Sequence, residues 1–349
     1  MLYIKKSILL VVISFIFMGG SCKKGSDNGT AKTAPSNLTI TAVPSTDGSG
    51  MVAFTATAIN AVSYDYEFGN GVIATIPTGV TNFKYTLAGN NTYTVTVTAK
   101  SSSGLTISKS ISVTVNVVIG PLALVWSEEF NVDGAPGSAK WGYDLGAGGW
   151  GNNEQQNYTN RLQNAAVLNG VLKITAIKES YNGSGYTSAR LLSKDKFSFK
   201  YGKIEVRAKI PAGGGTWPAI WMLGSNISTV SWPGCGEIDI MEHVGNNLNK
   251  IYGTLHHPGH SGGNADGGTI IIPDATTAFH DYIVEWSASS IKFYVDTQLF
   301  YTFANNGSLP FNQNFFIILN MAMGGNFGGV IDPAFTTATM EVDYVRVYQ

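Results

Sequence analysis

The chain has 349 residues, with 22 lysines and arginines against 23 aspartates and glutamates, and a formal net charge of −1. This balance gives no electrostatic basis for binding nucleic acid, and the length accommodates two globular domains. The only cysteines are Cys22 and Cys235, so we expect no disulfide framework. We interpret Cys235 as a small buried packing residue.

Residues 1–22 have the pattern of an export signal, with two lysines, a short apolar core and small residues before Cys22. The apolar core is too short to favour a transmembrane helix. Residues 19–22 resemble a bacterial lipobox, which implies a lipid anchor on Cys22 and export to the cell envelope, at the outer membrane or cell surface. An ordinary cleaved secretory peptide is the alternative. Residues 23–36 are polar and predict a flexible tether.

Residues 37–118 alternate apolar residues with threonine or serine between clusters of glycine and asparagine. This pattern predicts several short strands and a small β-sandwich. All seven tryptophans and all five histidines follow residue 120. Because sugar-binding sites favour flat aromatic faces, we expect this domain to be a spacer rather than a carbohydrate-binding module. Residues 64–71 resemble a PKD domain, which implies an immunoglobulin-like fold.

Residues 120–349 contain recurring strand patterns and no convincing long amphipathic helix, which predicts two stacked antiparallel sheets. The segment around Glu237, Asp239 and Glu242 is apolar apart from these acids. Strict strand alternation would turn Glu242 into the core, where an unpaired carboxylate costs several kcal/mol. A β-bulge near Ile240 or Met241 would return it to the acidic face. Three neighbouring carboxyls suit a glycosidase; an exposed acidic edge strand is the alternative.

With the segments 213–224 and 252–259 around it, this acidic strand resembles glycoside hydrolase family 16, most closely its bacterial laminarinases. The resemblance covers roughly residues 120–349 and implies a curved β-sandwich jelly roll, concanavalin A-like, with substrate along the concave face. It implies a monomeric endo-β-1,3-glucanase that acts on laminarin-like β-glucan by retaining double displacement without a catalytic cofactor. Glu237 would be the nucleophile, Glu242 the acid/base, and Asp239 would lie between them. A β-agarase or related galactan hydrolase is the first alternative, and a non-catalytic glucan-binding protein the second.

The resemblance also implies substrate-binding residues along the cleft. These candidates are Asn152, Glu154, Arg190, Trp217, Trp221, Trp232, His256, Gln313 and Asn320. We expect Trp217 and Trp232 to stack on sugar rings, and Trp221 could instead be a core residue. His256 is expected beside the acid/base, and the glycine-rich loop 259–268 on the aglycone side.

Two groups of residues were considered as metal sites. The three histidines His256, His257 and His260 suggest zinc, but the proline and glycine between them would break any helix that presented them together, and no cysteine joins them. We therefore expect no catalytic metal. Many members of the family hold a structural calcium ion, a cation that prefers oxygen ligands. The matching positions are Glu129, Gly170 and Asp343.

Overall fold

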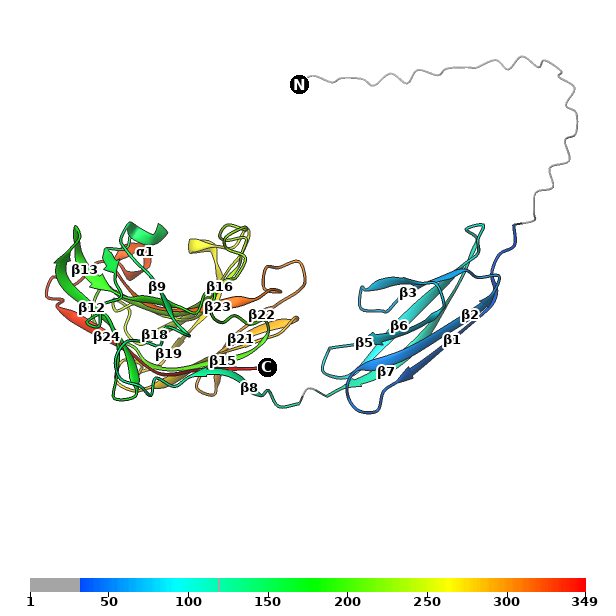
Figure 1. Cartoon of the computed structure of the whole chain (residues 1–349), viewed down its shortest axis with the longest axis horizontal. Coiled ribbons are helices and arrows are strands. Elements are labelled where there is room, and N and C mark those ends of the chain that lie inside the picture. The colour runs from blue at the N-terminus through cyan, green and yellow to red at the C-terminus, as the bar shows by residue number, and fades with distance from the viewer. Residues whose placement is uncertain (1–31, 119) are drawn as a thin grey trace, which may run out of the picture. The chain divides into compact units, whose positions relative to one another are not determined.

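The computed structural model describes residues 32–118 and 120–349, and the chain divides into two compact units between Gly120 and Pro121 (Figure 1). The predicted export signal, Cys22 and most of the predicted tether lie outside the described residues. Within the described part of the chain, no helix has both the length and the apolar character needed to cross a membrane. Each unit is built almost entirely from strands.

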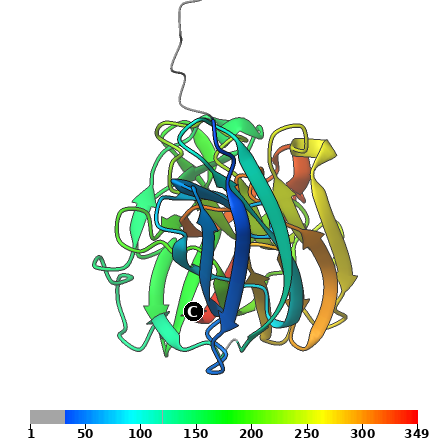
Figure 2. The same cartoon turned by 90° about the vertical axis from the view of Figure 1, so that its right-hand side faces the viewer.

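The N-terminal unit has two antiparallel sheets around one core, as predicted (Figure 2). One sheet contains β1 (Ser36–Pro44), β2 (Met51–Ile59) and β5 (Val80–Lys84); the other contains β4 (Ile73–Ile76), β3 (Ser63–Glu67), β6 (Gly89–Lys100) and β7 (Thr106–Val117). Alternation decides which side chains enter the core: Val113 and Val115 are buried, while Thr114 faces solvent and hydrogen-bonds Thr92 across the strand pair. The PKD resemblance stays a prediction.

The C-terminal unit stacks a ten-stranded sheet on a seven-stranded sheet (Figure 1). The larger sheet contains β8 (Leu124–Glu128), β10 (Gln156–Tyr158), β11 (Ala165–Leu168), β12 (Val171–Tyr181), β13 (Ser184–Ser188), β15 (Gly202–Lys209), β20 (His280–Trp286), β21 (Ser290–Val295), β22 (Gln298–Ala304) and β24 (Thr337–Tyr348). The smaller sheet has the order β19 (Asp266–Ile271), β18 (Lys250–His256), β17 (Glu237–His243), β16 (Thr216–Gly224), β23 (Phe315–Met323), β14 (Arg190–Leu192) and β9 (Gly142–Asp144).

The core of the C-terminal unit lies between these two sheets. Alternate residues such as Ile204 and Val206 of β15 meet Ile220 and Met222 of β16, and all four are buried. Every residue of β23 is buried, so both faces of the seven-stranded sheet are shielded from water at this strand. One face of this strand lies in the core. The other face carries Phe316 and Ile318, which form a second, smaller apolar cluster with Leu192, Leu223 and Cys235.

Helices are minor in both units. Among the described residues, the longest helix is α1 (Gly325–Gly328), with four residues, and two single 3-10 turns cover Gly149–Gly151 and Gly262–Asn264. The predicted all-β jelly roll, with a smaller β unit before it, is therefore confirmed.

Candidate active site

The acidic strand β17 contains the predicted bulge. Opposite it on β16, Trp221 pairs with Asp239, and the next pairs are Ile220 with Met241 and Ala219 with Glu242, so Ile240 is the extra residue. The register on the β18 side shifts at the same place. This single insertion puts Glu237, Asp239 and Glu242 on one face while Ile238 and Ile240 remain in the core.

Each glutamate of this group is held by a tryptophan. The indole Nε1 of Trp232 donates a 2.7 Å hydrogen bond to Glu237 Oε2, and the indole Nε1 of Trp217 donates one of 3.0 Å to Glu242 Oε1. The second oxygen of Glu242 accepts a hydrogen bond from Thr254 Oγ1 at 3.1 Å. The two carboxyl groups therefore have fixed orientations before a substrate arrives.

The three carboxyls strongly affect one another's protonation. Burial raises the pKa of all three, and the charge of Asp239 raises the pKa of Glu237 further, as the charge of Glu242 does for Asp239. Hydrogen bonds from Trp217 and Thr254 partly offset the effect of burial on the pKa of Glu242. Since these neighbouring carboxyls, two of them buried and Glu237 half-buried, cannot all ionise easily, the arrangement favours a shared proton in the group.

His256 was expected beside Glu242, and it lies nearest to Asp239 while its charge also acts on the pKa of Glu242. The β18 register places His256 opposite Glu237, and its Nε2 lies 3.2 Å from Asp239 Oδ2 and 3.9 Å from Glu237 Oε1. The bulge brings Tyr252 opposite Glu242 instead. The backbone N–H of Gly262 donates to His256 Nδ1 at 3.1 Å, so in the neutral ring the proton is on Nε2 and points to the acids.

Trp217 and Trp221 both face the side of the sheet that carries the acids, because residues four apart in a strand share a face. Trp221 is half-buried and packs against the second apolar cluster, which contains Phe316 and Ile318, in agreement with the core alternative. Its Nε1 donates a 2.7 Å hydrogen bond to Asn320 Oδ1. Trp232 is 44% exposed. Its ring is open to a ligand while its nitrogen holds Glu237.

One row of directly opposite residues crosses the face of the seven-stranded sheet that carries the acids. From β17 outward, Glu242 pairs with Ala219, Ala219 with Asn320, Asn320 with Arg190, and Arg190 with Asp144. Paired residues in adjacent strands share a face, and strands lie about 4.8 Å apart, so Arg190 stands roughly 14 Å from Glu242, about two to three sugar rings away. The predicted residues Arg190 and Asn320 thus lie in line with the acids.

Arg190 is enclosed rather than on the surface. Its guanidinium lies 4.7 Å from the Trp221 ring centroid and 5.0 Å from that of Trp150, and its Nε is 3.0 Å from Asp144 Oδ2. Neither Trp150 nor Asp144 was among the predicted residues. Trp150 begins the segment 150–158, which is rich in asparagine and glutamine and contains the predicted Asn152 and Glu154, so the sequence offered a signal for it. No sequence pattern pointed to Asp144.

Glu154 is half-buried, and its partial removal from water raises its pKa. Its oxygens accept hydrogen bonds from Asn152 Nδ2 at 3.3 Å, Gln156 Nε2 at 2.6 Å and the Tyr158 hydroxyl at 3.3 Å, and Tyr158 also binds Asn320. This network joins the predicted residues Asn152 and Glu154 to the row of opposite residues. Sequence reasoning missed Gln156 and Tyr158, and also Thr254.

Gln313 supports the backbone next to the acidic strand. Its Nε2 donates to the carbonyl oxygen of Cys235 at 2.8 Å, which holds the chain just before Glu237. Cys235 is fully buried, and burial raises the pKa of its thiol to about 11. The interpretation of Cys235 as a packing residue is confirmed.

The calcium positions offer few side-chain ligands. Both oxygens of Glu129 accept hydrogen bonds from Arg346, at 3.0 and 2.7 Å, and Asp343 Oδ2 lies 3.5 Å from Arg207 Nε. Gly170 lies in the turn between β11 and β12. Asp343 and backbone oxygens are what this region could offer a hard cation, and the calcium ion stays a prediction.

The jelly-roll fold, with indole-held carboxyls on a bulged strand of its seven-stranded sheet, is typical of a glycoside hydrolase. Residues 152–346, more than half of the 349 residues, match the sequence model for glycosyl hydrolases family 16, and the chain belongs to this family.

Individual relatives agree with this assignment. The chain is 47% identical over 242 residues to the β-glucanase of Rhodothermus marinus, covering 65% of this chain and 85% of that protein. The X-ray structure of the laminarinase from Rhodothermus marinus matches with a TM-score of 0.63 and 48% identity, over 65% of this chain and 97% of the other. A LamA variant from Zobellia galactanivorans, in complex with laminaritriose and laminaritetraose, matches with a TM-score of 0.61 and 43% identity, over 65% and 98%.

Proposed function

We propose that this glycoside hydrolase cleaves internal β-1,3-glucosidic bonds of laminarin-like β-glucans with retention of anomeric configuration. The observation that carries the proposal is the bulged strand, which turns three carboxyls to one face and leaves an indole N–H on each glutamate. A double displacement needs one carboxylate to attack and one carboxylic acid to protonate the leaving oxygen.

The first step uses Glu237 and Glu242 in different protonation states. Glu237, oriented by Trp232, attacks the anomeric carbon. Glu242, whose pKa is raised by burial, gives its proton to the leaving sugar oxygen. The proton on His256 Nε2 points to Asp239, so this pair steadies the charge beside the nucleophile.

The second step reverses the role of Glu242. Once Glu237 is esterified to the sugar it carries no charge, so the repulsion between the charges of Glu237 and Glu242 is removed. Glu242 can then exist as a carboxylate and take a proton from water, which attacks the ester. Trp217 and Thr254 stabilise that carboxylate, because they donate to both of its oxygens.

Substrate preference follows from the side chains that share a face with the acids. Trp232 offers an exposed flat ring at the acids. Arg190 lies about two to three sugars away and Asn320 one strand nearer to the acids. Asn152 and Glu154, joined to Asn320 through Tyr158, add further hydrogen-bonding groups. Among the relatives, the LamA variant was solved with laminaritriose and laminaritetraose, which supports a β-1,3-glucan as substrate. A galactan hydrolase of the same family would keep the acids, and a non-catalytic binding protein would be expected to lose one.

Product analysis tests this specificity. The purified chain should release oligosaccharides from laminarin and curdlan and none from agarose, with lichenan reporting any tolerance of mixed linkages. Release from agarose without release from laminarin would overturn the glucanase proposal in favour of a galactanase. An absence of cleavage on all four polysaccharides would favour the binding protein.

The location of the enzyme is a separate proposal that rests on residues 1–36. We propose export and lipid anchoring through Cys22, with the N-terminal unit acting as a spacer between membrane and enzyme. Fatty-acid labelling should be lost in Cys22→Ala. A wild-type chain that takes up no label and stays fully soluble would contradict the anchor.

A further inference from the structure

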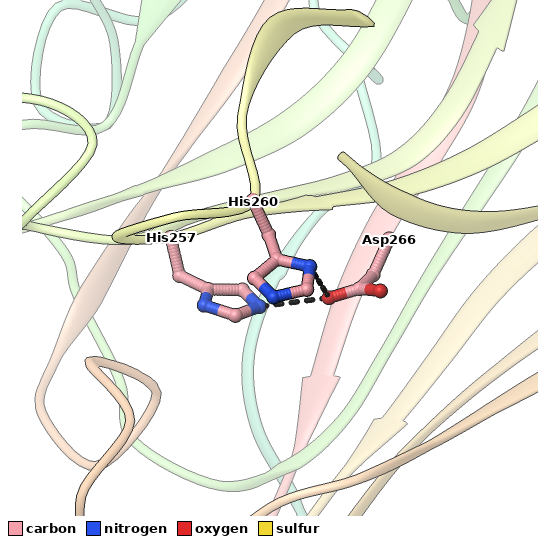
Figure 3. Close-up of side chains that lie close together, drawn as sticks. All are labelled: His257, His260 and Asp266. Atoms are coloured by element: carbon pink, nitrogen blue, oxygen red, sulfur yellow. Dashed lines mark hydrogen bonds and ion pairs between the residues drawn. The ribbon is translucent and has the colours of Figure 1, made fainter. Parts of the chain in front are cut away.

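Behind the acidic face, two histidines and an aspartate meet at the end of β18 (Figure 3). His257 and His260 flank the pair Pro258 and Gly259, and their backbones exchange N–H···O hydrogen bonds of 2.8 and 2.9 Å. Gly259 has φ of +83°, which a glycine adopts without strain, and proline suits the preceding position of such a turn. A tight turn, rather than a helix, thus sets the two histidines opposite each other.

The turn aims both rings at one oxygen. The imidazole rings stack with centroids 4.7 Å apart at an interplanar angle of 17°. Asp266, the first residue of β19, places Oδ2 2.9 Å from His257 Nε2 and 3.1 Å from His260 Nδ1. The two nitrogens and the carboxylate oxygen all lie within 4.8 Å of one another.

His257, His260 and Asp266 take no part in the proposed catalytic steps. His256 faces the acids, and its neighbour His257 faces the other side of the sheet, since strand neighbours alternate. His257 is buried there, with its ring centroid 5.6 Å from that of Phe311 and 5.8 Å from that of Phe303. The side chain of His260 is 49% exposed. His257 is therefore held rigidly, and solvent reaches the group at His260.

We propose that His257 Nε2, His260 Nδ1 and a carboxylate oxygen of Asp266 bind one divalent transition-metal ion, with Zn²⁺ as the best fit. Zinc takes imidazole nitrogens and carboxylate oxygens at about 2.0–2.2 Å in a tetrahedron, which separates donor atoms by about 3.3 Å. The distances of 2.9 and 3.1 Å from Asp266 Oδ2 to the nitrogens need to widen only slightly. Two imidazoles do not suit calcium or magnesium, which prefer oxygen ligands. Water from the exposed side completes the tetrahedron.

A metal ion here would fasten the loop that runs from His257 to Asp266. The same loop carries Gly262, whose N–H holds His256 Nδ1 at 3.1 Å, and His256 in turn faces Asp239. The ion would therefore act structurally, by fixing the loop that orients His256. The sequence-based expectation of no catalytic metal is not affected, although its argument from a broken helix overlooked the turn.

Titration of the full-length protein with metal ions tests the site. After dialysis against a chelator, the wild type should bind one Zn²⁺ per chain at micromolar concentration or tighter by calorimetry, and Co²⁺ should give a visible absorption band. Zinc should also raise the thermal unfolding midpoint. His260→Gln, at a half-exposed position that tolerates substitution, and Asp266→Asn should weaken binding by at least about 100-fold and abolish the rise.

Asp274→Asn is the matched control. Asp274 lies 3.2 Å from His280 in a second histidine–carboxylate group, and its loss should leave zinc binding and the thermal shift unchanged. The proposal is overturned if the wild type binds no zinc below millimolar concentration, which would make the group a hydrogen-bonded cluster. It is also overturned if His260→Gln keeps one tight equivalent of zinc, which would place the ion elsewhere, for instance at His256 and the catalytic acids.

Discussion

β7 of the N-terminal unit and β17 of the C-terminal unit differ in the regularity of their alternation and in the burial of their residues. β7 keeps strict alternation, so valines fill the core and threonines and serines meet water and pair with β6. β17 breaks alternation once, at Ile240, and six of its seven residues are buried. A regular strand with a solvated face stabilises a fold, while a bulge in a strand shielded on both faces concentrates ionisable groups. The chemistry of this chain lies where the pattern breaks.

The largest effect on the rate of laminarin hydrolysis should come from Glu242→Gln. Without general acid/base help, hydrolysis of laminarin should slow roughly 10²–10⁴-fold. The corresponding change on the regular strand, Thr114→Ala, should leave activity unchanged. If both variants kept wild-type rates, the distinction between the two strands would have no catalytic meaning.

The same variant should be more stable than the wild type at neutral pH. Burial raises the pKa of Glu242 in the folded state, so ionising it destabilises the fold as pH rises above the carboxyl's ordinary value of about 4.3. Glutamine removes this penalty while keeping an oxygen for Trp217. Thermal midpoints of variant and wild type should agree near pH 4 and diverge, with the variant higher, towards pH 7. A constant difference at all pH values would contradict the assigned direction.

A smaller loss is expected from Trp217→Phe, which keeps a ring against Phe327 and removes the N–H donor to Glu242. Losing a hydrogen bond to a charged group should slow the reaction about 10- to 100-fold. Because that bond lowers the pKa of Glu242, the alkaline limb of kcat/KM should move to higher pH. In the control Trp221→Phe, which loses a bond to Asn320 instead, the limb should not move.

Arg190→Lys should affect binding more than chemistry. Lysine keeps the charge and loses the flat group that lies over Trp150 and Trp221. KM for laminarin oligosaccharides long enough to reach Arg190 should rise about tenfold, a difference of about 1.4 kcal/mol, with kcat nearly unchanged. Arg161→Lys, where the guanidinium lies over Tyr181, is the control. Equal changes in both variants would argue against a substrate contact at Arg190.

Removing residues 23–118 should have the smallest effect. The chain divides into compact units between Gly120 and Pro121, and a unit with its own core can fold alone, so rates on short soluble oligosaccharides should stay within about twofold. A folded truncated protein that lost most of its activity would show that the regular strands of the N-terminal unit take part in catalysis.

The acids, their bulge and the two-sheet architecture could be predicted because local rules determine them. Alternation fixes which residues share a face, and the cost of burying Glu242 forces the extra residue. The partner of His256 could not be predicted in this way, because the pairing of β17 with β18 decides it. The enclosure of Arg190 by Trp150, Trp221 and Asp144 joins distant segments of the chain. The meeting of His257, His260 and Asp266 needed both a tight turn and the β18–β19 register.

The central claim is that Glu237 and Glu242 have different roles on one bulged strand, and azide separates those roles most directly. In Glu242→Ala the glycosyl-enzyme still forms on Glu237 when an activated aryl β-glycoside is used, so azide should displace the sugar and yield a β-glycosyl azide. In Glu237→Ala, azide should occupy the space left by the nucleophile and attack the substrate directly, yielding the α-anomer. The opposite anomers would reverse the two roles, and an inverted product from the wild-type protein would contradict the double displacement itself.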